Sequence, residues 1–138
     1  DQDFFAWITH NVQLLRSGRL SELDAEHVAE ELESMGKRDL RQLRSRLQVL
    51  IMHLLKWEHQ PDKRGPSWLR TIDHQRDEIE ALLLDSPSLR PRLAEASPQI
   101  YAKAVRDAAC ETGLAEDALP HECPYELDDM LAAGFLPD

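Results

Sequence analysis

Large apolar residues recur in steps of three and four between residues 38 and 58, and this pattern constrains the fold more than any other. The residues that share it are Leu40, Leu43, Leu47, Leu50, Leu54 and Trp57. Because residues three and four apart lie on one face of an α-helix, the pattern predicts a helix with a continuous apolar stripe. Ile51 and Leu55 widen the stripe, which indicates that this helix packs on more than one side. We therefore expect residues 38–58 to form the central helix of a bundle.

The rest of the chain also shows the helical period. Further helices are predicted over residues 3–16, 25–35, 68–84, 87–96, 98–112 and 126–133. The segments on either side of Pro98 can instead form one helix that is kinked at this proline. The alternation of apolar and polar residues that is typical of strands is absent. The sequence therefore predicts an all-α fold, a single-domain bundle of five to six helices, with the short helix over residues 126–133 following the bundle.

Glycine and serine residues are expected to mark the ends of these helices. Glycine readily adopts the left-handed conformation that closes a helix, so Gly18, Gly36 and Gly113 are expected to follow helix C-termini. Ser67 precedes an apolar-periodic segment and is expected to cap its first turn.

A length of 138 residues is typical of one domain. We expect residues 1–113 to form the helical bundle and residues 114–138 to form a packed tail of the same domain with one short helix. After Arg106 the chain has nine acidic residues and no lysine or arginine. The predicted tail is therefore short and acidic on its outer face.

The whole chain carries 26 acidic and 16 basic residues, a formal net charge of −10. This charge repels phosphate backbones and anionic lipids, so we expect no nucleic-acid or membrane partner. No apolar run reaches the roughly 18–20 residues of a membrane-spanning helix. Cys110 and Cys123 are expected to be free thiols in a reducing cytoplasm, although their spacing also allows them to pair.

A polar cluster is predicted beside the leucine stripe. Arg46, His53 and Trp57 lie along one flank of this stripe on a helical wheel. Glu31 has the same kind of position on the preceding predicted helix, and Gln75 interrupts the apolar stripe of a later one. If these flanks face each other, the five residues meet. We favour a structural network that sets the helix register over an anion-binding or acid–base site.

Charge is segregated along the chain. Residues 20–34 carry six acidic residues and no basic one, whereas residues 37–46 carry five basic residues and one acidic one. We expect the two segments to pair within the fold. The alternative is that the basic segment binds an acidic partner or a short phosphate backbone, although it has no aromatic residue on which bases could stack.

Histidines and cysteines provide weak metal-binding patterns. His27 shares a helix face with Glu30 and Glu31, but a second carboxylate–histidine pair is missing. His121 and Cys123 lack the second Cys-x-x-Cys of a structural zinc site. The phosphate-binding loop and the nucleophile-elbow motif are also absent from the sequence. We therefore expect no metal and no cofactor.

Several short motifs together resemble a known family. They are Phe5-Ala6-Trp7, Glu30-Glu31-Leu32-Glu33-Ser34-Met35-Gly36, Met52-His53-Leu54-Leu55-Lys56-Trp57, Gln60-Pro61, Glu111-Thr112-Gly113-Leu114 and Cys123-Pro124-Tyr125. With these motifs the chain resembles, over essentially its whole length, a bacterial family catalogued as domain of unknown function number twenty-nine, common in cyanobacteria and proteobacteria. The resemblance implies an all-helical cytoplasmic protein. It implies no catalytic residues.

The function class that we favour is a small acidic interaction module that binds another protein or a second copy of itself, rather than an enzyme. The alternative is a small-molecule or metal-dependent helical-bundle enzyme that uses His53, Glu31 and His27. An enzyme of this kind needs an open polar cavity. A module that binds proteins does not.

Overall fold

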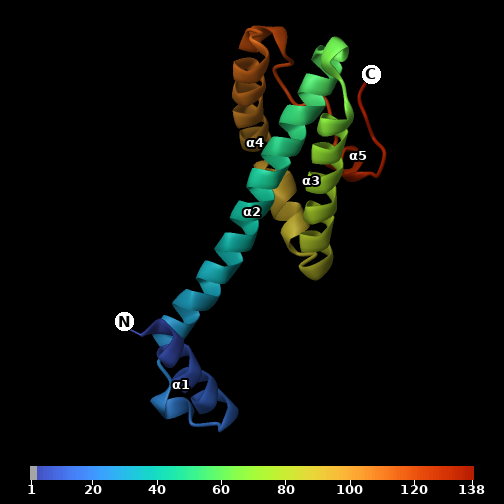
Figure 1. The fold of residues 1–138 in the computed structure, drawn as a ribbon. Coiled ribbons are helices and arrows are strands. Elements are labelled where there is room, and N and C mark those ends of the chain that lie inside the picture. Colours follow the sequence, from blue (N-terminus) through green and yellow to red (C-terminus); the bar gives the residue numbers. More distant parts are fainter. Residues whose placement is uncertain (1–2) are drawn as a thin grey trace. The chain divides into compact units, whose positions relative to one another are not determined.

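Residues 3–138 are described by a computed structural model, and all the regular structure in this range is helical. The α-helices are α1 (Phe4–Arg16), α2 (Ala25–His59), α3 (Pro66–Asp85), α4 (Leu89–Thr112) and α5 (Leu127–Leu131). Single 3-10 turns lie at Leu20–Glu22, Pro61–Lys63 and Glu116–Ala118. The predicted all-α fold of five to six helices is therefore confirmed (Figure 1). Within the described range, no helix combines the length and the apolarity needed to cross a membrane.

The contacts between residues divide the chain into two compact units, which we describe separately. Unit 1 is Asp1–Arg38 and unit 2 is Asp39–Asp138. Unit 1 contains α1 and the first turns of α2, and unit 2 contains the remainder of α2 together with α3, α4 and α5. The predicted division into a bundle over residues 1–113 and a tail over residues 114–138 stays a prediction.

Helix α2 continues through Gly36, so the predicted helix end at this residue is wrong. Glycine in a helix interior costs only about 0.5–1 kcal/mol relative to alanine, whereas ending the helix leaves backbone groups without intrahelical partners. No proline follows Gly36 to stop the helix. Glu33 and Lys37 are also four residues apart in the order that favours a helix. The segments 25–35 and 38–58 therefore belong to one helix.

In unit 1, polar contacts fix α1 against the start of α2. The Asp3 side chain caps α1 by accepting a hydrogen bond from the Ala6 backbone N–H (3.0 Å). After α1 the chain turns at Gly18, which has a left-handed φ of 74°. The buried Asn11 side chain accepts a hydrogen bond from the backbone N–H of Asp24 (3.0 Å), directly before α2. This bond fixes the position of α1 along α2.

The core of unit 2 is built on the leucine stripe of α2. The fully buried residues of this helix are Leu43, Leu47, Leu50, Ile51, Leu54 and Leu55. They share one apolar cluster with side chains of α3 and α4, among them Ile72, Ile79, Leu93 and Ile100. The sequence prediction of a helix that is packed on more than one side is confirmed by the burial of Ile51 and Leu55.

The helix ends in unit 2 differ in part from the predicted ones. Pro66 opens α3 and Gly65 precedes it, so Ser67, the predicted cap, lies inside the helix. Proline is tolerated in the first turn because the N–H groups there have no intrahelical partner. Helix α4 continues through Pro98, so the single-helix alternative is the correct one. Gly113 ends α4 as predicted, with a φ of 77°.

A buried arginine attaches the C-terminal segment to α3. Arg76 donates one hydrogen bond to the Met130 carbonyl (2.7 Å) and another to the Phe135 carbonyl (2.9 Å). The buried Tyr125 donates its hydroxyl hydrogen to the Glu58 carboxylate near the end of α2 (2.7 Å). A buried polar group that loses its partner costs free energy, so these bonds select one position for the segment.

We predict that truncation of the leucine stripe destabilises unit 2. Leu47 and Leu50 are 0 % exposed, so Leu47→Ala and Leu50→Ala should each lower the free energy of unfolding by about 2–5 kcal/mol. Leu84 is 85 % exposed, and Leu84→Ala should change it by less than about 0.5 kcal/mol. Urea unfolding of the three variants measures these values. Losses below about 1 kcal/mol at both buried sites would show that the stripe is exposed in solution.

We also predict that Gly36→Ala stabilises the protein. Gly36 lies within α2, its φ is not positive, and an added Cβ would meet no atom within 4 Å. The substitution should therefore raise the free energy of unfolding by about 0.4–1 kcal/mol. Gly113→Ala is the matched control and should lower it, because the φ of 77° strains any residue with a side chain. A destabilising Gly36→Ala would mean that α2 is broken there.

Candidate protein-binding groove

Exposed apolar side chains are concentrated in unit 1. Of the eight large apolar side chains that are exposed within residues 3–138, seven lie between residues 4 and 35. They are Phe4, Phe5, Ile8, Leu15, Leu20, Leu32 and Met35. The predicted apolar faces of α1 and of the first turns of α2 therefore exist, but they remain open to solvent.

Part of this surface forms a groove, with a volume of about 440 Å³, between α1 and the first turns of α2. Its apolar lining consists of Phe4, Trp7, Ile8, Val12, Leu15, Val28, Leu32 and Met35. Asn11, Glu31 and Arg38 add the polar groups. Leu32 is 63 % and Met35 55 % exposed, so the wall formed by α2 is largely uncovered. We call this surface the groove.

A network of hydrogen bonds connects α1 with the start of α2 beside the groove. The Trp7 indole N–H donates to Asp24 Oδ2 (3.0 Å), and the Asn11 amide donates to the Trp7 carbonyl (3.0 Å). Asp24 also contacts His27 Nδ1, at 2.8 Å from its Oδ1. A carboxylate can only accept, so His27 Nδ1 carries the proton in this contact. Asp24 therefore links the Trp7 ring to the first turn of α2.

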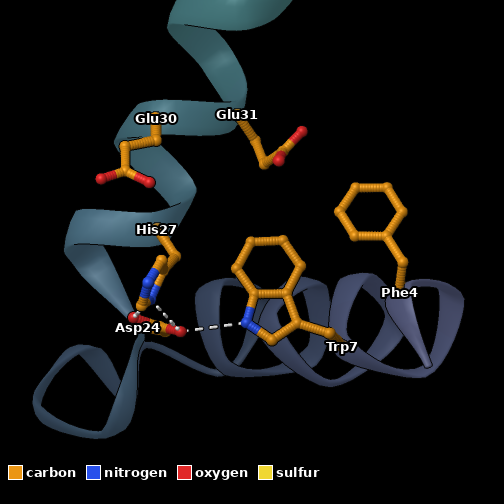
Figure 2. A pocket seen from close by; sticks show the side chains of 6 residues that line it. All are labelled: Phe4, Trp7, Asp24, His27, Glu30 and Glu31. Atoms are coloured by element: carbon orange, nitrogen blue, oxygen red, sulfur yellow. Dashed lines mark hydrogen bonds and ion pairs between the residues drawn. The ribbon is translucent and has the colours of Figure 1, made fainter. Parts of the chain in front are cut away.

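A second hollow, of about 260 Å³, shares Phe4, Trp7 and Glu31 with the groove. We call it the acidic pocket, and its remaining lining residues are Asp24, His27 and Glu30. The Phe4 and Trp7 rings are stacked, with centroids 5.7 Å apart. Figure 2 shows both rings projecting from α1 towards α2, and the Glu31 side chain projecting from α2 on the side of the rings. The pocket thus combines aromatic faces with carboxylates.

The charges at the acidic pocket shift two pKa values. The hydrogen bonds that Asp24 accepts, first from Trp7 and then from His27, lower the pKa of its carboxyl group. The same carboxylate raises the pKa of His27, mainly through the hydrogen bond, and the charge of Glu30 adds to this effect. Both shifts favour an ionised Asp24 paired with a protonated His27.

The polar cluster predicted from sequence is assembled only in part. Arg46 donates a hydrogen bond to the Gln75 side chain (3.2 Å), as predicted. Its acidic partner is Glu78 on α3, at 3.4 Å. Glu31 cannot face Arg46 across a helix hairpin, because both belong to α2 and are about four helical turns apart. The predicted pairing of the acidic and basic segments is wrong for the same reason.

The other two predicted members lie near Arg46 in sequence but bond elsewhere. His53 Nδ1 donates to the Val49 carbonyl one turn earlier (2.9 Å). Burial is the main reason why the pKa of His53 is lowered, and the positive charge of Lys56 adds to it. Trp57 contacts the Arg64 guanidinium, whose central carbon lies 5.0 Å from the ring centroid. A chemical role for these residues stays a prediction.

The described part of the chain assembles no group of metal-ligating side chains and no disulfide. Among residues 3–138, no three side chains of histidine, cysteine, aspartate or glutamate are grouped so that they could hold a metal ion. Cys110 and Cys123 are both free, so they do not form the disulfide that their spacing allowed.

Sequence reasoning missed the residues that build the acidic pocket on the side of α1. The sequence patterns place Trp7 in a family motif and assign no functional role to Phe4 or Trp7. The aromatic run Phe4-Phe5-Ala6-Trp7 near a helix start was the available signal. It could not show that Trp7 reaches Asp24, which is 17 residues away in sequence.

Comparison with known protein families identifies a match over almost the whole chain. The family model described as Domain of unknown function DUF29 matches residues 1–136. No curated protein and no solved structure matches the chain. The match confirms the resemblance that the motifs indicated.

We predict that Asp24 sets the titration of His27. The raised pKa of His27 means that the pair stabilises unit 1 fully below pH about 6.5, and that this contribution is lost as pH rises through the raised pKa. The lowered pKa of Asp24 has the opposite sense, with a contribution lost as pH falls through it. NMR titration should give a lower His27 pKa in Asp24→Asn. Glu33→Gln, a matched charge change, should leave it unaltered. An unchanged pKa in Asp24→Asn would show that the pair does not form.

Proposed function

This chain belongs to the DUF29 family of unknown function, and we propose that its activity is to bind another protein through the groove. The observation that carries this proposal is the contrast within α2. The stripe of this helix in unit 2 is 0 % exposed at Leu47 and Leu50, whereas Leu32 in unit 1 is 63 % exposed. An apolar helix face is stable when another element covers it, and two helices leave the groove uncovered.

A protein fits the groove better than a small molecule does. Small-molecule sites usually enclose most of their ligand. Here Phe5 and Leu20, which do not line the groove, add further exposed apolar surface to unit 1, at 78 % and 62 % exposure. Exposed apolar surface with polar residues at its edge is typical of protein interaction sites.

We do not propose the alternative of a helical-bundle enzyme. It requires His53, Glu31 and His27 to act together. Nδ1 of His27 is hydrogen-bonded to Asp24, and Nδ1 of His53 to the Val49 carbonyl. Each histidine therefore bonds to a residue three or four positions away in sequence, and not to the other histidine or to Glu31.

We further propose that the module works in a bacterial cytoplasm and needs no cofactor. Two free cysteines suit a reducing compartment. The net charge of −10 does not favour a nucleic acid or an anionic membrane as partner.

Site-specific photocrosslinking tests the proposal in the organism that encodes the protein. Benzoylphenylalanine at position 32 lies in the groove, and at position 84 it replaces a leucine of unit 2 that is even more exposed than Leu32. We expect one defined crosslinked protein from position 32 and none from position 84. Equal crosslinking from both positions would contradict the proposal.

The partner that the crosslink identifies, once purified on its own, allows a quantitative prediction for its binding to this protein. Leu32→Glu should raise its Kd about 10- to 100-fold, because the partner loses the burial of one leucine side chain. Since Leu32 is exposed, the free energy of unfolding should change by less than about 0.5 kcal/mol. Leu84→Glu should leave the Kd within about twofold, by the same reasoning. An unaffected Kd in Leu32→Glu would place the binding surface elsewhere.

A further inference from the structure

We infer that the groove binds an amphipathic helix of a partner protein, and that an arginine or lysine of this helix occupies the acidic pocket. This inference rests on the proposed function and specifies the chemistry of the partner. It is carried by the shape of the groove, by the composition of the pocket and by the charge of the surrounding surface.

The shape of the groove suits a helix. On α1 the lining extends from Phe4 to Leu15, which is about 16 Å or three helical turns. On α2 it extends from Val28 to Arg38, about 15 Å. A third helix laid between these walls would place apolar residues at three- and four-residue spacing onto both, which is the usual way in which a groove binds an amphipathic helix.

The acidic pocket has the composition of a cation site. The face of a tryptophan ring attracts a cation, and an arginine side chain can also stack on it. Phe4 stacks on Trp7 and extends the aromatic surface. Glu31 lies on the same side as these rings (Figure 2) and lines both the pocket and the groove. A helix in the groove can therefore place one of its side chains in the pocket.

Two carboxylates of the pocket are available to this cation. Asp24 is engaged by Trp7 and His27. Among residues 3–138, by contrast, no hydrogen bond or ion pair is formed by the side chains of Glu30 and Glu31. The segment of residues 20–34 has six acidic residues and no basic one, so its field attracts a basic partner. The one basic residue that lines the groove is Arg38.

The same charges disfavour a second copy of this chain as the occupant. In a twofold dimer the same surface of each copy faces the other. A dimer that placed the two acidic pockets against each other would bring Glu30 and Glu31 of both copies together. A separate protein with a basic helix avoids this repulsion.

Designed peptides test the inference on the full chain. The probe is a helix of about four turns with leucines along one face and a single arginine beside them, and a series of peptides moves this arginine along the helix. Each peptide has a counterpart in which citrulline, which has the same shape without the charge, replaces arginine. In fluorescence anisotropy at low salt, the best arginine peptide should bind about 3- to 30-fold more tightly than its counterpart.

Variants of the protein locate the cation. In Glu30→Gln/Glu31→Gln the advantage of arginine over citrulline should disappear, while the Kd of the citrulline peptide stays within about twofold. Glu26→Gln/Glu33→Gln makes the same change of charge on the same helix but outside the pocket, and should retain at least half of the advantage. In NMR spectra, the Trp7 indole N–H should shift with the arginine peptide more than with the citrulline peptide.

Each failure has a distinct meaning. Equal affinity for both peptides, or equal loss in the two double variants, would overturn the inference and leave the proposed function intact. A dimer that Leu32→Glu dissociates would overturn it in favour of a second copy. Peptide binding that Leu32→Glu leaves unaffected would overturn the proposed function as well.

Discussion

The backbone hydrogen-bond ladder of α2, continuous from Ala25 to His59, is the constraint on which the rest of the structure depends. The predicted pairing of residues 25–35 with residues 38–58 would have required a helix break at Gly36. Continuing the helix costs one unfavourable glycine and retains the intrahelical bonds around it. As a result, α2 carries two apolar stripes, one in each unit.

The stripe in unit 2 is buried and the stripe in unit 1 is largely exposed, because the two have different neighbouring helices. In unit 2, α3 and α4 together supply enough apolar surface to bury Leu43, Leu47, Leu50 and Leu54 completely. In unit 1, α1 is the one α-helix available besides the start of α2. It buries Leu14 and Asn11 but leaves the groove open. The groove is therefore a consequence of how few elements unit 1 contains.

Polar contacts give unit 1 its order where apolar burial is incomplete. Asp24 accepts a hydrogen bond from the Trp7 indole and contacts His27, and its own backbone N–H donates to Asn11. These contacts hold the Trp7 ring at the wall that the groove and the acidic pocket share. Because the ring is already held, the binding that we propose would require little ordering of the site. Trp7 thus belongs both to the polar network and to the lining of the groove.

The sequence by itself determined the helical class, the buried leucine stripe and the turns at Gly18 and Gly113, because local periodicity and backbone preference decide them. It also indicated a cluster that includes Arg46, at the flank of the leucine stripe, and Gln75, within the apolar face of another helix, and these two side chains are hydrogen-bonded. Tertiary structure decided the continuity of α2, the choice of Glu78 rather than Glu31 as the acidic partner of Arg46, and the exposure of Leu32. An apolar stripe in a sequence shows which residues need a partner. Whether the chain supplies that partner depends on which helices pack together, and α1 together with the start of α2 leaves the described groove open.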